Sequence, residues 1–221
     1  METGDIDLAH EFLRNNGVGV ASKRVTYQVG DGPSTNSFDR DDLDITLDLY
    51  YGLCTGGSGT YYASINWYYD WALGDNGDDP NDVAAIHYDK NWWNTDGDSV
   101  SEAIDTSDYV EYADGSYGGE GPGFTVDDQG ADWAGDEDDY FYGGVYLNEI
   151  GDYSGSQRAV LGEYQHNWTE ESTSISSVSV SYPAGISVSF TNEEVTKSWK
   201  TDTEQDGDTW LEVYQKDASG C

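Results

Sequence analysis

The 221-residue chain contains 44 Asp and Glu residues but only 9 Lys and Arg, which gives it a formal charge of −35 at pH 7. Binding to nucleic acid or to an anionic membrane surface depends on Lys and Arg contacts, so this charge argues against both partners. No apolar run approaches the ~20 residues that a membrane span requires, which argues against membrane insertion. Cations, neutral glycans, other copies of the chain and other surface proteins remain as partners.

The acidic excess is mostly Asp, with 30 Asp to 14 Glu. This composition is typical of extreme halophiles, above all haloarchaea. At molar salt the Debye length falls to about 3 Å, so that each carboxylate is screened from most of the others. We therefore expect folding to require high K⁺ or Na⁺. We also expect the protein to be extracellular or at the surface of a cell or virion of an extreme halophile.

High net charge is also typical of disordered chains, but those are poor in aromatic residues. Here Trp, Tyr and Phe make up 14% of the chain, which favours a packed core inside an acidic shell. The length suits one domain spanning residues 1–221. The two cysteines, Cys54 and Cys221, either form one disulfide or remain as free thiols.

The chain begins with a predicted helix over Asp5–Asn15. Its apolar residues recur near helical spacing, and they are Ile6, Ala9, Phe12 and Leu13. Asp5 suits the N-terminal cap, and Gly17 suits the stop. After it, alternating or ring-rich patterns predict strands. These are Val18–Val29, Asp44–Leu53, Tyr61–Leu73, Val83–Tyr88, Tyr109–Tyr112, Tyr140–Ile150, Arg158–Trp168, Val195–Thr201 and Thr209–Tyr214, and a bulge is expected at Gly143-Gly144.

The clearest pattern is a hairpin over residues 174–190. Val178, Val180 and Tyr182 alternate with serines, Pro183-Ala184-Gly185 turns the chain, and the alternation returns through Phe190. This pattern predicts one apolar face toward the core and one hydroxyl face toward water. Together the elements predict an all-β fold, an antiparallel β-sandwich or jelly roll with one short N-terminal helix.

Few residues suggest catalysis. The three histidines, His10, His87 and His166, stand in no recognisable catalytic motif, so the sequence identifies no catalytic or cofactor-binding residue. Paired carboxylates of a glycoside hydrolase cannot be selected among 44 acids.

A calcium site is one interpretation of the loop after residue 201. Asp202, Glu204, Asp206 and Asp208 occupy positions 1, 3, 5 and 7 of a loop with Gly207 at position 6, like the first half of an EF-hand. The bidentate Glu expected at position 12 is missing. The alternative is a tight acidic turn between two strands, without specific Ca²⁺ binding.

Aromatic clusters offer glycan stacking as a second kind of site. The candidates are Trp67, Tyr69, Trp71, Trp92 and Trp93, and the alternative is that these rings fill the core. Asn167 begins the Asn-Trp-Thr acceptor pattern for N-glycosylation.

The sequence favours a non-enzymatic structural or adhesive surface protein, a subunit of a filament, a cell envelope or a virus particle. A carbohydrate-binding module using exposed aromatic residues is the alternative, and a secreted carboxylate-dependent glycoside hydrolase is a third possibility. Exposed in-line rings would favour the module, and a cleft with two convergent acids would favour the hydrolase.

We expect the fold to require roughly molar salt, because repulsion among the acids of residues 41–157 is otherwise unscreened. That segment contains 27 acids and one basic residue, Lys90. Dialysis to about 10 mM salt, where the Debye length is about 30 Å, should abolish the native circular dichroism and tryptophan fluorescence spectra. Unchanged spectra at that salt would contradict the expectation.

Overall fold

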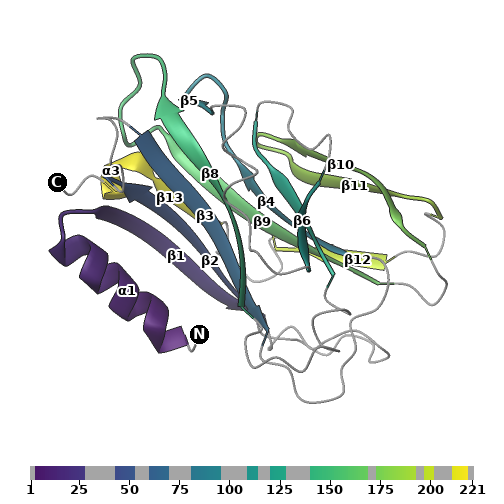
Figure 1. The fold of residues 1–221 in the computed structure, drawn as a ribbon. Helices are drawn as coiled ribbons and strands as arrows, with labels where there is room; N and C mark the ends of the chain where they lie inside the picture. The colour runs from purple at the N-terminus through teal and green to yellow at the C-terminus, as the bar shows by residue number, and fades with distance from the viewer. Residues whose placement is uncertain are drawn as a thin grey trace.

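The computed structural model describes residues 3–27, 43–52, 60–69, 81–95, 109–113, 120–127, 140–168, 173–192, 197–201 and 211–218. Over these residues the protein is an antiparallel β-sandwich with a short N-terminal helix, which confirms the predicted fold class (Figure 1). Neither of the helices described has the length and apolar composition needed to cross a membrane.

Helix α1 (Thr3–Asn15) opens the described chain, and the short α3 (Gln215–Ala218) closes it. The strands between them are β1 (Gly19–Tyr27), β2 (Leu43–Tyr51), β3 (Thr60–Tyr69), β4 (Asp82–His87), β5 (Trp93–Asn94), β6 (Val110–Tyr112), β7 (Gly123–Val126), β8 (Tyr140–Glu149), β9 (Ala159–Trp168), β10 (Ile175–Ser181), β11 (Gly185–Phe190), β12 (Lys197–Lys200) and β13 (Leu211–Tyr214).

Two antiparallel sheets pack face to face. Sheet A has the strand order β1-β2-β3-β8-β5, and sheet B has the order β12-β9-β4-β7-β6, with β13 also paired to β9. Strands β12 and β13 pair with successive halves of β9. Helix α1 lies on the outer side of sheet A, and the β10-β11 hairpin lies on the outer side of sheet B (Figure 1). The molecule is thus layered as helix, sheet A, sheet B and hairpin.

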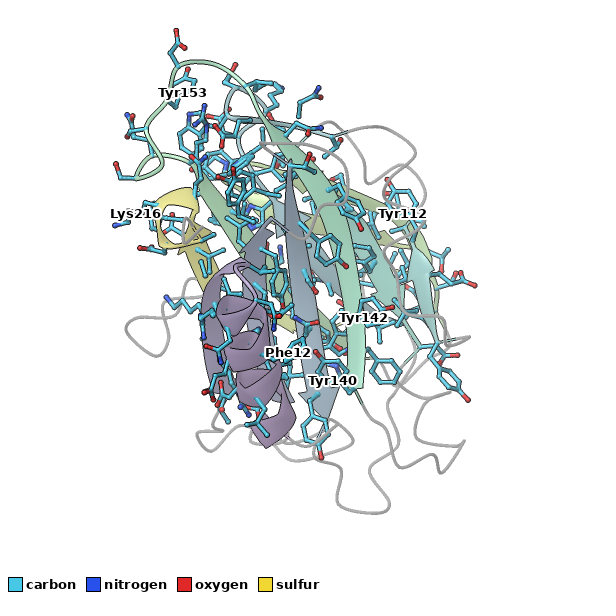
Figure 2. All side chains as sticks on the ribbon, turned by 60° about the vertical axis from the view of Figure 1, so that its left-hand side comes forward. Phe12, Tyr112, Tyr140, Tyr142, Tyr153 and Lys216 are labelled. Carbon is cyan, nitrogen blue, oxygen red and sulfur yellow. The ribbon has the colours of Figure 1, made fainter. Side chains whose placement is uncertain are left out.

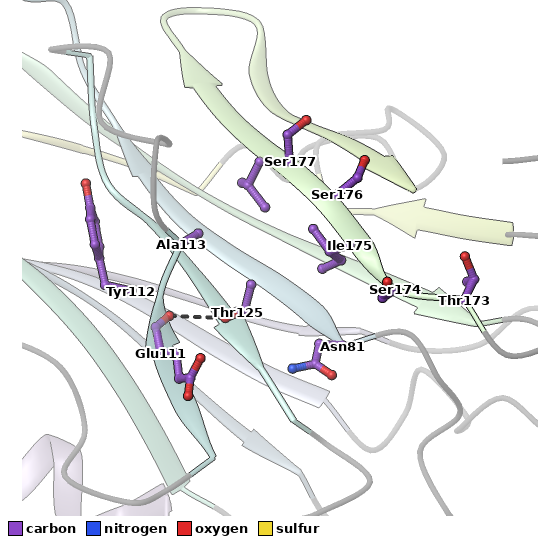
Figure 3. Close-up of a pocket in the computed structure, with 11 residues that line it drawn as sticks. Asn81, Glu111, Tyr112, Ala113, Thr125, Thr173, Ser174, Ile175, Ser176 and Ser177 are labelled. Atoms are coloured by element: carbon purple, nitrogen blue, oxygen red, sulfur yellow. Dashed lines mark hydrogen bonds between the residues drawn. The ribbon is translucent and has the colours of Figure 1, made fainter. Parts of the chain in front are cut away.

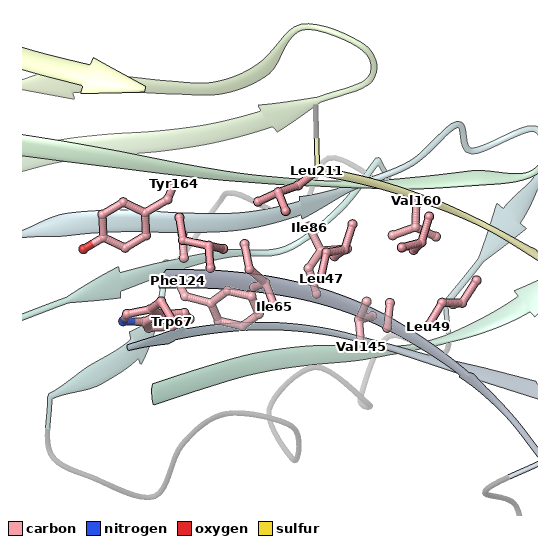
Figure 4. Close-up of a cluster of buried hydrophobic side chains, with 14 of the residues drawn as sticks. Leu47, Leu49, Ile65, Trp67, Ile86, Phe124, Val145, Val160, Tyr164 and Leu211 are labelled. Atoms are coloured by element: carbon pink, nitrogen blue, oxygen red, sulfur yellow. The ribbon is translucent and has the colours of Figure 1, made fainter. Parts of the chain in front are cut away.

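The core lies between the two sheets because every second side chain of each strand points inward. On β2 these residues are Ile45, Leu47 and Leu49, which are fully buried. They meet side chains from sheet B, among them Ile86, Phe124, Val160, Tyr164 and Leu211 (Figure 4). Each such side chain contributes roughly 1.5–3 kcal/mol relative to remaining exposed.

Two residues on the outward side of β2 are shielded from water. Thr46 and Asp48 are buried because sheet A carries α1 on that side. His10 of the helix approaches Tyr50 Oη with Nε2 at 3.2 Å and Asp48 Oδ1 at 3.3 Å. Tyr50 Oη and Asn66 Nδ2 each donate to Asp48 Oδ2 at 3.0 Å. These contacts bind the helix to the sheet through polar groups.

The helix prediction was right in position and wrong at its first residue. The helix ends at Asn15, followed by Gly17 at φ 84°, which is the left-handed conformation that suits glycine at a helix end. It begins at Thr3, two residues before the predicted cap at Asp5. The side chains of residues 3–5 lie outside the described part.

Every predicted strand appears within the described ranges, but three short elements were missed. They are strands β5 and β7 and helix α3, and no strand or helix was predicted over these residues. Both cysteines lie outside the described residues.

The bulge predicted at Gly143-Gly144 was wrong. Strand β8 pairs one-to-one with β3 through both glycines, Ile65 with Gly143 and Ser64 with Gly144. The glycines instead make room for rings. A Cβ at Gly143 would lie 2.6 Å from the Phe124 ring, and one at Gly144 would lie 2.2 Å from the Tyr62 hydroxyl oxygen.

The hairpin of residues 174–190 has the predicted register. Val178 pairs with Val188 and Val180 with Ile186, while the intervening serine pairs point outward. Val178, Val180 and Ile186 pack on Val83 and Ala85 of β4, a second cluster separate from the central core. The hairpin therefore adds a further layer over sheet B.

Replacing Val180 by Asp should destabilise the protein by several kcal/mol, because the carboxylate would be buried without a partner. Val180 is buried, whereas its neighbour Ser179 is exposed. Ser179→Asp should change the free energy of unfolding by less than about 0.5 kcal/mol. Urea titrations of both variants in molar salt measure the difference. Equal losses would mean that the hairpin faces have been assigned wrongly.

Candidate functional site

A buried acid of sheet B forms a hydrogen bond with one end of the β10-β11 hairpin. Glu163 of β9 accepts a hydrogen bond from the Ile186 amide at 2.7 Å and lies 3.2 Å from the Lys200 ammonium group. Lys200 also donates to the Ile186 carbonyl oxygen. Gly185 has φ 76°, and a Cβ there would lie 1.8 Å from Glu163 Oε2. The close approach of this carboxylate therefore requires glycine at the first residue of β11.

A second acid holds the turn of the hairpin. Glu120 Oε2 accepts from the Tyr182 amide at 3.1 Å, and Glu120 Oε1 pairs with Lys90 at 2.9 Å. The Lys90 ammonium group, and after it the Tyr182 amide, lower the pKa of Glu120. The Tyr182 ring also contacts Trp92 edge-on, with centroids 5.5 Å apart. The turn is thus fixed by polar and aromatic contacts together.

His87 lies under this turn, on the outer face of β4. It is buried, and its Nδ1 has no hydrogen-bond partner in the described part of the chain. Burial, and after it the positive charge of Lys200, lower the pKa of His87 to about 4. His87 is therefore neutral at neutral pH. The His87 ring packs beside the Tyr182 ring, with centroids 6.4 Å apart.

The opposite end of the hairpin lines an open groove. This hydroxyl groove has a volume of about 420 Å³ and lies between β10 and the outer face of β6 and β7 (Figure 3). Its lining is rich in hydroxyl groups and comprises Asn81, Glu111, Tyr112, Ala113, Thr125, Thr173, Ser174, Ile175, Ser176, Ser177 and Val178. None of these described lining residues is Lys or Arg, so the groove offers no cation to an anionic ligand.

Some polar groups of the groove are already used within the fold. Ser176 Oγ donates to the Ser189 carbonyl at 2.9 Å, and the Thr173 and Thr191 hydroxyls are 3.0 Å apart. The side chains of Asn81, Glu111 and Ser177 make no hydrogen bond to the described residues. These three side chains place an amide, a carboxylate and a hydroxyl in different parts of the lining (Figure 3).

Two of the three histidines have acidic partners that the sequence did not reveal. His166 Nδ1 lies 2.9 Å from both carboxylate oxygens of Asp82, which also accepts from Tyr164 Oη at 2.5 Å and the Asn167 amide at 2.8 Å. Asp82 and His166 are both buried, so this pair joins β4 to β9 and does not meet solvent. A separation of 84 residues explains why no local motif marked it.

The predicted stacking rings do not form an exposed row. Trp67 and Trp93 lie in the central core, which corrects the glycan-stacking assignment for both. Trp92 is partly buried between Tyr153 and Tyr182. The side chain of Tyr69 and residue Trp71 lie outside the described part. On β3 the odd-numbered side chains that are described, Trp67 among them, face the core.

The predicted glycosylation at Asn167 was wrong. Its side chain is 0% exposed, donates through Nδ2 to the Asn81 carbonyl at 3.0 Å and accepts from Gln165 at 2.6 Å. A glycan cannot be attached to an amide that is buried in this network. The predicted calcium ligands Asp202, Glu204, Asp206 and Asp208 lie outside the described residues, so that site stays a prediction.

Acidification should destabilise the protein through His87. Between pH 6.5 and 4 the unfolded chain protonates this residue while the folded protein resists protonation, so stability falls as the pH falls. A shift from 6.5 to about 4 corresponds to a loss of about 3 kcal/mol. The His87→Gln variant retains all 44 acids but does not titrate at this site. Subtracting its unfolding free energies from those of the wild type isolates the effect, and parallel pH profiles would contradict it.

Comparison with known proteins supplies no template for this groove. No family model, no curated protein and no solved structure matches the chain. The function must therefore be inferred from the chemistry of the groove and from the charge of the surface around it.

Proposed function

We propose that the chain is a non-enzymatic adhesive subunit at the surface of an extreme halophile, in a cell envelope, a filament or a virus particle. We propose further that its hydroxyl groove binds a neutral glycan. The observation that carries the proposal is the lining of the groove, which combines hydroxyl and amide groups with a single carboxylate and no described cation.

The lining suits a ligand that both donates and accepts hydrogen bonds. Sugar hydroxyls do both, and Asn81, Glu111 and Ser177 have hydrogen-bonding capacity to spare. Ala113, Ile175 and Val178 add apolar surface against which C–H groups of a sugar can pack. The volume falls within the roughly 300–1,000 Å³ of small-ligand sites. An anionic glycan would meet Glu111 and the acidic surface without a compensating cation.

The same lining gives less support to a glycoside hydrolase. Hydrolysis of a glycosidic bond requires two carboxyl groups on opposite sides of the bond. The described lining contributes one, Glu111. Binding without cleavage is the simpler use of these residues.

Surface location and salt adaptation rest on composition. A net charge of −35 on 221 residues is compatible with a packed core when counter-ions are concentrated. The same charge keeps single molecules apart at low salt, so an adhesive role through neutral groups fits a saline environment.

Retention on columns of immobilised neutral glucan, mannan and galactan, in molar KCl, tests the groove. We expect at least one of these polymers to retain the protein and an anionic polygalacturonate column not to retain it. Asn81→Ala and Ser177→Ala should each weaken binding of the retained glycan roughly fivefold, the effect of losing one hydrogen bond.

Ser179→Ala is the matched control, because Ser179 is an exposed serine of the same strand that does not line the groove. It should leave the affinity unchanged. Failure of all three neutral glycans to retain the protein, or binding that is insensitive to the groove variants, would overturn the proposal. Release of reducing sugar from the column would replace it with the hydrolase.

A further inference from the structure

Strand β10 contains an extra residue where it lines the hydroxyl groove. Ile175 pairs with Phe190 of β11. Two residues further along β10, Ser177 pairs with Ser189, which is only one residue from Phe190. Ser176 therefore has no cross-strand partner, which is the arrangement of a β-bulge. The lining of the groove includes this residue and both of its neighbours.

The bulge changes which residues of β10 face sheet B. Before it, Ile175 packs against the apolar cluster that joins the hairpin to β4. After it, Val178 and Val180 are buried in the same cluster. Ser176 and Ser177, which lie between them, are both exposed. Two exposed residues thus separate the inward-facing Ile175 from Val178, where plain alternation would place one.

The packing of the hairpin does not require the extra residue. Without Ser176, plain alternation would place Ile175 inward, Ser177 outward and Val178 inward, as they already lie. The cross-strand pairs of Ile175 and Ser177 would also be unchanged. The Ser176 side chain makes one hydrogen bond to the described residues, from Oγ to the Ser189 carbonyl at 2.9 Å. Because bulges are common next to functional sites, where they redirect side chains, this one points to a role in the groove.

The bulge widens the space between two apolar contacts of the groove. Ile175 and Val178 both line it, opposite the outer face of β6 and β7. One extra residue adds up to about 3.3 Å to their separation along β10. The polar backbone and hydroxyl groups of Ser176 and Ser177 lie in between. A sugar ring carries both C–H and hydroxyl groups, so this order of apolar, polar and apolar contacts suits it.

The groove is long on its β10 side. Six consecutive residues line it there, from Thr173 to Val178, and an extended segment of this length spans about 15 Å. A single terminal sugar would fill only part of this length, whereas successive units of a linear glycan would fill it. Because the groove is open, a longer chain can continue beyond it.

We propose that the bulge at Ser176 determines the specificity of the groove, and that the glycan it selects is a linear neutral chain. The chain lies along β10 with one ring between Ile175 and Val178. This role of the bulge rests on the glycan binding proposed above. Ser176 is a positioning residue, because its backbone sets the spacing while its hydroxyl bonds within the hairpin.

Deleting Ser176 tests the bulge. The shortened protein should fold, with a melting temperature in molar KCl within about 4 °C of the wild type, because its cross-strand pairs and buried side chains are retained. It should bind the glycan that retains the wild type on the order of tenfold more weakly, because a sugar ring fits the shortened wall less well. Ser176→Ala is the matched control, since it keeps the bulge and removes only the hydroxyl. It should stay within about threefold of the wild-type affinity.

Ile175→Trp tests the same space without a change in the backbone. The Ile175 side chain is partly buried and lines the groove, so a larger ring there would occupy the position proposed for the sugar. The variant should bind the glycan on the order of tenfold more weakly. Its melting curve in the same buffer verifies folding.

Free sugars prepared from the retained polymer test the linear chain. A trisaccharide should elute the protein from the column at about one tenth of the monosaccharide concentration or less, because it adds contacts along β10. Equal elution by the two sugars would indicate a site for a single unit and overturn the linear chain.

Tyr153→Ala is the control for stacking of a sugar on a ring elsewhere. Tyr153 is 40% exposed and contacts Trp92. Figure 2 shows it well apart from Tyr112, which lines the groove. The variant should retain the wild-type affinity. A loss equal to that of the Ser176 deletion would place the glycan on these rings and overturn the proposal.

The remaining outcomes separate the bulge from the glycan function. A wild type that binds none of the neutral polymers would remove the glycan function, and the role of the bulge with it. Wild-type affinity after both the Ser176 deletion and Ile175→Trp would leave the glycan function and overturn the role of the bulge. Equal losses in Ser176→Ala and in the deletion would trace the effect to the hydroxyl. A deletion variant that does not fold would show that the bulge serves packing, which also contradicts the proposal.

Discussion

The alternation of side chains along each strand is the constraint on which the rest of the structure depends. Because successive residues point to opposite sides, each sheet has one face that must be apolar and one that is free for other uses. In this acidic chain the apolar faces of sheets A and B meet and exclude water. Among the described residues, the buried acids are Asp48, Asp82 and Glu163. Each accepts hydrogen bonds from another part of the chain, which offset the cost of its desolvation.

The outer faces differ because they are covered differently. Sheet A carries one helix attached through a histidine and a tyrosine, and sheet B carries a hairpin attached through Glu120 and Glu163. The hairpin covers sheet B incompletely, and the part left open forms the hydroxyl groove. The groove is therefore the remainder of a face that the described elements cover only in part.

The local sequence pattern predicted the positions of the strands well, but it predicted poorly which of their side chains are buried. The Val–Ser alternation around Val180 gave the hairpin and its register, because a period of two with one apolar face leaves a single arrangement. Aromatic rings occur on both faces of β3, so the sequence alone did not show which face is buried. In the structure Trp67 lies on the buried face, which packs against sheet B. The acceptor pattern at Asn167 failed for a similar reason, because its burial depends on Asn81, which is 86 residues away.

The groove itself was beyond the reach of sequence patterns. Its lining joins Asn81, Glu111 and Ser177, which come together only when the hairpin folds over sheet B. The short strands beside the groove were also hard to predict from the sequence. Strand β7 lies in a glycine-rich stretch with little alternation, and it pairs with β4 and β6 through long-range contacts.

The order of the layers also determines how the groove is presented. The groove lies on the hairpin side of the sandwich, and helix α1 lies on the opposite side (Figure 1). A molecule held by its α1 side would therefore direct the groove outward. Such a molecule would connect the surface that holds it to a second one, as a cross-link between neighbouring layers of polymer.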